Sequence, residues 1–165
     1  MKIIFSFICI SIFLFGCQSS TLQSNKNILE LQNKNLVNNT SQNPEVAYLI
    51  KEGLELIDKN DLKKASKTFN TALQLDMTNS HLQFLNANTY HVMALQYDTS
   101  YFDLAVEGYK LSINLDNTNW YPRYYLGLLY LDKKEYSSAQ DYLADALLYN
   151  TEDPDIIYNF IVFDY

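Results

Sequence analysis

The sequence LKKASKTFNTALQLD at residues 62–76 returns in altered form as FDLAVEGYKLSINLD at 102–116 and as YSSAQDYLADALLYN at 136–150. All three stretches carry an alanine at the same place, at intervals of 40 and 34 residues. Self-similarity at such intervals is typical of proteins built from stacked repeats. The other matching positions are Leu62, Phe102 and Tyr136; Phe69, Tyr109 and Leu143; Ala72, Ser112 and Ala146; and Asp76, Asp116 and Asn150.

Each of these stretches has its apolar residues at helical spacing and its charged residues on the opposite face. A second helical pattern lies upstream of each one, at about 46–59, 81–97 and 121–132. Short polar joints at 59–61 and 132–134 connect the two patterns of the first and third pairs. Helices joined by tight turns form antiparallel hairpins, and hairpins in series stack into a solenoid. The sequence therefore predicts an all-α solenoid of helix-turn-helix units.

Small residues in the upstream helices, Gly53, Ala87 and Gly127, would let the two helices of each hairpin approach closely. Together with Ala65, Ala105 and Ala139, and with Leu56, Tyr90 and Tyr130 three residues after the small ones, they form a pattern that resembles the tetratricopeptide repeat (TPR) family. The resemblance implies one domain over 45–165, with repeats at about 46–79, 80–119 and 120–153 and a partial fourth at 154–165. Repeat two has six extra residues near 96–101, so we expect its first helix or its turn to be longer.

In the TPR family, four positions of each first helix line the concave inner face of the solenoid. The resemblance implies that a peptide or helix of a partner protein binds there, and tyrosine on such a face is typical of binding hot spots. We predict these contact residues: Ile50, Leu54 and Ile57 in repeat one; His81, Phe84, Asn88 and His91 in repeat two; Tyr121, Tyr124, Leu128 and Leu131 in repeat three. The two histidines are either partner contacts or simply polar, partly exposed helix residues, and the second interpretation is favoured.

The N-terminus has the pattern of an export signal. Lys2 precedes a run of apolar residues from Ile3 to Phe15, which at about 1.5 Å per residue is too short to span a bilayer. The following Leu14-Phe15-Gly16-Cys17 resembles a bacterial lipobox, which implies that residues 1–16 are removed and that Cys17 carries the lipid; an ordinary signal peptide is the alternative. Gln18, by the same resemblance, implies an outer-membrane lipoprotein that faces the periplasm.

A tether is expected between the anchor and the repeats. Residues 17–44 are rich in Asn, Gln and Ser and contain few strongly apolar residues. Such a composition cannot bury much surface, so we expect disorder there.

Composition also limits the function. The net charge of −7 argues against nucleic acid as a partner, and the four glycines and two cysteines leave little room for a phosphate-binding loop or a thiol site. We identify no catalytic residue, metal site or cofactor site. Residues 80–165 carry four basic and twelve acidic side chains, which would favour a partner with a basic segment.

Three functions fit these observations. Lipoproteins of this kind are similar to assembly factors for pili or secretion systems, and also to adaptors that recruit cell-wall enzymes to the outer membrane. A hydrolase with a cryptic site is the third, and the lack of any paired nucleophile and base in the sequence weighs against it.

The end of the sequence is unusually apolar for the last helix of a solenoid. We expect Ile157 and Ile161 to face repeat three, which would leave Ile156, Phe160, Val162 and Phe163 without cover. The interpretation is that the chain is either a truncated product or self-associates through 154–165.

Overall fold

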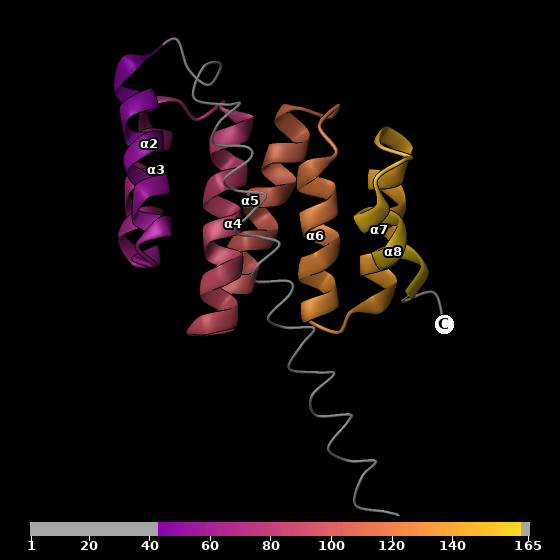
Figure 1. The fold of residues 1–165 in the computed structure, drawn as a ribbon. Helices are drawn as coiled ribbons and strands as arrows, with labels where there is room; N and C mark the ends of the chain where they lie inside the picture. Colours follow the sequence, from indigo (N-terminus) through magenta and orange to yellow (C-terminus); the bar gives the residue numbers. More distant parts are fainter. Residues whose placement is uncertain (1–42, 163–165) are drawn as a thin grey trace, which may run out of the picture. The chain divides into compact units, whose positions relative to one another are not determined.

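The computed structural model describes residues 43–162, which form seven helices and no strand. Figure 1 shows them as successive antiparallel pairs in a row, α2 with α3, α4 with α5 and α6 with α7, followed by α8. The predicted all-α solenoid with three hairpins and a partial fourth is confirmed. The predicted signal, Cys17 and most of the tether lie outside the described residues. The bounds are α2 Pro44–Asp58, α3 Leu62–Leu75, α4 Ser80–Gln96, α5 Tyr101–Leu115, α6 Tyr121–Asp132, α7 Tyr136–Tyr149 and α8 Pro154–Val162.

In each hairpin, the two helices approach each other most closely at a glycine, where there is no room for a side chain. A Cβ atom added to Gly53 would lie 2.3 Å from Cε1 of Phe69, and one added to Gly127 would lie 2.8 Å from Cγ of Leu143. In the second hairpin the small residues are exchanged: Ala87 stands on the first helix, and its Cβ lies 2.8 Å from the place of a Cβ on Gly108. The predicted close approach is therefore present in all three hairpins. The role of Gly108 did not emerge from the sequence.

The repeated alanines are the core of the solenoid. Ala65, Ala105 and Ala139 are fully buried, and so are Ala72 and Ala146 seven residues after the first and the last of them. Ser112, at the same position in the second hairpin, is 1% exposed, and its hydroxyl donates a 2.7 Å hydrogen bond to the carbonyl of Ser80. This bond satisfies a polar group inside the interface, which is why serine is tolerated among alanines.

The turns and joints repeat with the helices. Asn60 and Lys134 occupy equivalent places in the first and third hairpins, and both adopt positive φ, 58° and 62°. Amides of both turns donate back to the preceding helix at 2.8–2.9 Å, which ends the helix with a reversal. Between repeats, Asn79, Asn119 and Asp153 each accept a hydrogen bond from a first-turn amide of the next helix at 3.0–3.1 Å. These caps fix where each repeat begins.

The six extra residues of repeat two lengthen its first helix by four, its turn by one and the start of its second helix by one, Tyr101. Gln96 ends α4 nine residues after Ala87, whereas α2 ends five residues after Gly53, so α4 gains about one helical turn. The loop at 97–100 is four residues long, compared with three at 59–61. The sequence had left open which of the two elements would lengthen.

The predicted orientation of α8 is wrong. Ile156 is fully buried, whereas Ile161 is 54% exposed. The reason is that Asp153 accepts hydrogen bonds from the amides of Asp155 and Ile156, and this cap starts the helix with Ile156 turned inward. The exposed large hydrophobic residues of α8 are Tyr158, Ile161 and Val162.

We expect Ala139→Leu to destabilise the domain by about 1–3 kcal/mol, because the added methylenes overpack a site with no free surface. Urea unfolding measures the effect. Ser137→Leu, on the exposed face of the same helix, is the control and should change stability by less than about 0.5 kcal/mol. Equal midpoints for the two variants would show that the helix register is wrong.

Candidate partner-binding site

The structure divides the predicted inner-face residues into two groups. The half-buried ones can offer surface to a partner: Ile57, His81, Tyr121, Leu128 and Leu131. The others are buried and support the inner face from within: Ile50, Leu54, Phe84, Asn88, His91 and Tyr124. The expectation that both histidines are partly exposed is wrong for His91, which is 3% exposed. A binding role for the half-buried group stays a prediction.

Aromatic rings fill the space behind the inner face. Phe84 meets Tyr125 edge to face, with ring centroids 5.2 Å apart, and its ring lies 5.9 Å from that of Tyr109. Tyr124 contacts Tyr125 at 5.5 Å, and its hydroxyl accepts a 3.2 Å hydrogen bond from Asn159. These contacts join α4, α5, α6 and α8. Tyr124, one of the predicted contact residues, is therefore part of the core.

A chain of polar side chains runs through the same region. His91 Nε2 lies 2.9 Å from a carboxylate oxygen of Asp132, and Nδ1 of the same ring lies 3.4 Å from the Tyr109 hydroxyl. That hydroxyl donates to Asn88 at 3.1 Å. Because a carboxylate only accepts, Nε2 carries the ring proton. The single hydroxyl proton of Tyr109 is used on Asn88, so the 3.4 Å approach to the unprotonated Nδ1 is a polar contact and not a second hydrogen bond. These side chains connect α4, α5 and α6.

This alignment of hydroxyl, imidazole and carboxylate does not make an accessible nucleophile. Tyr109 has no exposed surface, and burial raises the pKa of its hydroxyl well above the ordinary value. A substrate cannot reach the oxygen, and the phenolate is disfavoured. The arrangement therefore acts as a packed structural network.

A stacked aromatic pair stands at the beginning of α6. The rings of Trp120 and Tyr121 lie 3.9 Å apart at an angle of 21°, and both side chains are half-buried. Stacking orders both rings before any partner arrives, and Trp and Tyr are the residues most often found in binding hot spots. The sequence had identified Tyr121 but not Trp120, since the family pattern places no inner-face position there.

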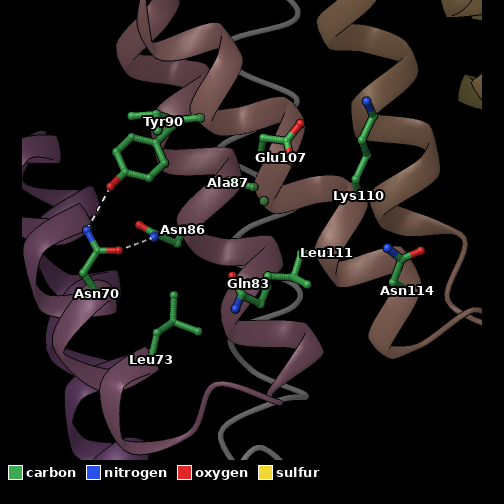
Figure 2. A pocket seen from close by; sticks show the side chains of 12 residues that line it. Asn70, Leu73, Gln83, Asn86, Ala87, Tyr90, Glu107, Lys110, Leu111 and Asn114 are labelled. Atoms are coloured by element: carbon green, nitrogen blue, oxygen red, sulfur yellow. Dashed lines mark hydrogen bonds between the residues drawn. The ribbon is translucent and has the colours of Figure 1, made fainter.

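A second concave feature lies on α3, α4 and α5, away from the predicted residues. It is a groove of about 470 Å³, shown in Figure 2. In this outer groove, Asn86 donates a 2.8 Å hydrogen bond to Asn70, and Asn70 donates a 2.9 Å bond to the Tyr90 hydroxyl. The groove is lined by Asn70, Leu73, Gln83, Asn86, Ala87, Tyr90, Leu104, Glu107, Gly108, Lys110, Leu111 and Asn114.

One atom in the outer groove has no partner. Asn86 is 6% exposed, and its side-chain oxygen accepts no hydrogen bond. A buried acceptor without a donor costs about 1–3 kcal/mol. The sequence alone could have drawn attention to Asn86. Repeat three carries Leu126 at the matching position, and asparagine is unusual on an interior helix face.

One carboxylate of α7 forms a structural ion pair. Asp145 on α7 accepts a 2.6 Å hydrogen bond from Nε of Arg123, which is 5% exposed. The Arg123 guanidinium also lies 4.5 Å from the ring centroid of Tyr149. This ion pair fastens α6 to α7.

No protein-family model matches this chain, and no curated protein matches it. Solved structures do. The first TPR domain of Spaghetti, bound to an HSP90 peptide, is 12% identical, with 76% of this chain and 94% of that chain covered and a TM-score of 0.65. The Yersinia enterocolitica type III secretion chaperone SycD, in complex with a peptide of the translocator YopD, is 15% identical, with 74% and 94% covered and a TM-score of 0.63. MamA is 25% identical, with 67% and 61% covered and a TM-score of 0.58. The fold is that of TPR domains.

The stability of the domain should respond to pH through His81. Burial lowers the pKa of this imidazole from 6.5 to about 4. Between pH 6.5 and pH 4, His81 is therefore protonated in the unfolded chain and neutral in the folded chain. The folded state therefore loses stability as the pH falls from about 6.5 to about 4, by roughly 2 kcal/mol for this half-buried ring.

Urea unfolding of wild type and His81→Gln across this range isolates the effect, because the carboxylates titrate equally in both chains. We expect the stability of the wild type relative to the variant to fall with falling pH. Parallel pH profiles would show that the His81 ring is solvated in the folded state.

Proposed function

We propose that this protein is a lipid-anchored scaffold that faces the periplasm at the outer membrane of a bacterium. Its repeats hold a segment of a partner protein, and its task is that of an assembly factor for a pilus or secretion system. The observation that carries the docking role is the stacked Trp120–Tyr121 pair beside the half-buried inner-face residues.

The chemistry of the inner face suits a peptide. Leu128 and Leu131 offer apolar area that can bury a partner side chain, and His81 and Tyr121 add polar groups that can hydrogen-bond to its backbone. The aromatic core behind them keeps the inner face rigid, which reduces the conformational entropy lost on binding. Two domains of the same fold, those of Spaghetti and SycD, were solved with peptides bound, and SycD is a secretion chaperone.

The anchoring role is supported by the sequence at 1–17. In the part of the chain covering 43–162, no helix is both long enough and apolar enough to cross a bilayer. Acyl chains on Cys17 would hold the protein at the membrane, because two or more chains bind far more stably than one.

Tyr121→Ala should weaken the binding of the partner by more than about 1 kcal/mol, roughly a fivefold loss of affinity, because it removes half of the stacked pair. Chemical cross-linking in intact cells, followed by purification of the full chain, captures and quantifies the partner. Tyr48→Ala is the matched control, because this tyrosine is 64% exposed on α2 and outside the predicted set. A partner captured equally by wild type and Tyr121→Ala would contradict the docking proposal.

Cys17→Ser should abolish the anchor, because lipid attachment and cleavage both depend on the thiol. We expect the wild-type chain to begin at an acylated Cys17 and to fractionate with the outer membrane, and the variant to keep residues 1–16. Mass spectrometry of the N-terminal peptide measures both. An unmodified Cys17 within a longer wild-type chain would contradict the anchoring proposal.

A further inference from the structure

The row of inner-face residues on the first helices continues onto α8. His81 on α4, Tyr121 on α6 and Asp155 on α8 follow one another at intervals of 40 and 34 residues, as the buried alanines of the second helices do. The residue two places before each of them caps its helix: Asn79, Asn119 and Asp153. The residue directly after each of them is buried: Leu82, Pro122 and Ile156. Asp155 therefore occupies on α8 the place that Tyr121 has on α6.

The packing of α8 on α6 repeats the packing of α6 on α4. Phe84 of α4 meets the ring of Tyr125 on α6, with centroids 5.2 Å apart. The residues that follow these two by one repeat are Tyr124 and Asn159, and they meet through a 3.2 Å hydrogen bond from the amide to the hydroxyl. The side chain of Asp155 is thus directed as those of the inner face are.

Asp155 brings a charge to a face that otherwise has none. The predicted inner-face residues of α2, α4 and α6 include no lysine, arginine, aspartate or glutamate. Asp155 is exposed, and among residues 43–162 its carboxylate takes part in no ion pair. Burial raises the pKa of the Tyr124 hydroxyl, and the negative charge of Asp155 raises it further, so the carboxylate acts on α6 across the space between the two helices.

We propose that Asp155 and the stacked Trp120–Tyr121 pair form a binding site for an arginine side chain of the partner segment, an inference that rests on the proposed docking role of the inner face. Trp120 and Tyr121 are half-buried at the beginning of α6, and the ring of Trp120 also lies 6.1 Å from that of Tyr124. A planar guanidinium stacks on aromatic rings and pairs with a carboxylate through its edge, which an ammonium group does less well.

Charge complementarity supports a cationic occupant. Residues 136–162 contain aspartates and glutamates but no lysine, arginine or histidine, so the whole end of the solenoid attracts a positive segment. A second copy of this chain cannot supply the arginine. Its single arginine, Arg123, is 5% exposed and is held by Asp145. The arginine therefore belongs to a different protein.

The rest of α8 indicates how the segment is built. Tyr158 and Val162, which follow Tyr124 and Leu128 by one repeat, are 63% and 44% exposed and offer apolar surface beside Asp155. Ile161 stands where the third hairpin has Gly127, so a second helix cannot approach α8 as closely as in the hairpins. An extended segment fits instead. Residues two places from its arginine point to the same side, so an apolar residue there would meet Tyr158 or Val162.

The test uses the fluorescence of Trp120, which is the only tryptophan of the chain. The full chain in detergent micelles is titrated with the blocked peptide acetyl-Leu-Ala-Arg-Ala-Leu-amide. We expect a saturable change of emission, and binding weaker by about fivefold or more for the same peptide with citrulline, the uncharged isostere of arginine. Added salt should weaken the binding of the arginine peptide and leave that of the citrulline peptide unchanged.

Three variants examine the carboxylate. Asp155→Asn should bind the arginine peptide as weakly as the wild type binds the citrulline peptide, whereas Asp155→Glu keeps the charge and should retain binding. Asp141→Asn is the matched control, because it removes an exposed carboxylate from α7 and should leave binding unchanged. Melting temperatures verify that the variants are folded. If Asp155→Asn disrupts α8, the comparison of the two peptides on the wild type decides.

The arginine site and the docking role of the inner face can fail separately. No saturable change, equal binding of the two peptides, or undiminished binding by a folded Asp155→Asn would each overturn the arginine site. If any of these is found while Tyr121→Ala still reduces the captured partner, the docking role stands without the arginine site. If the partner is captured equally by wild type and Tyr121→Ala, the proposed function fails, and selective binding of the arginine peptide would still support the site itself.

Discussion

The close approach of two helices at a residue without a bulky side chain is the constraint on which the solenoid depends. At Gly53 and Gly127 the partner side chain occupies the volume where a Cβ would be, and in the middle hairpin Ala87 and Gly108 share this task between them. Interiors are packed to the density of organic crystals, so such contacts permit one register. The buried alanines then follow, because larger residues would push the paired helices apart.

From this packing come both surfaces of the domain. The first helices turn their aromatic residues inward, where Phe84 and Tyr125 form the rigid support of the inner face. The second helices α3 and α5, together with α4, line the outer groove, and Gly108 is among the lining residues. At the matching position of repeat three, Tyr142 stacks on Tyr130.

Polar side chains inside the domain have two different fates. Tyr109 donates to Asn88, and His91 is held by Asp132, which makes these side chains part of the structure. Asn86 is left with an unused acceptor, at a cost that the fold does not recover.

The sequence by itself determined the repeat, the helical hairpins and the register of the alanines, because periodicity and side-chain size depend on local spacing. It also identified the candidate inner-face positions. Only the tertiary structure decided which of these are accessible: Tyr124 is buried against Tyr125 and Tyr121 is not, although both fit the same pattern. The unpaired oxygen of Asn86 likewise depends on neighbours that are distant in sequence, such as Asn70, which one-dimensional spacing does not encode.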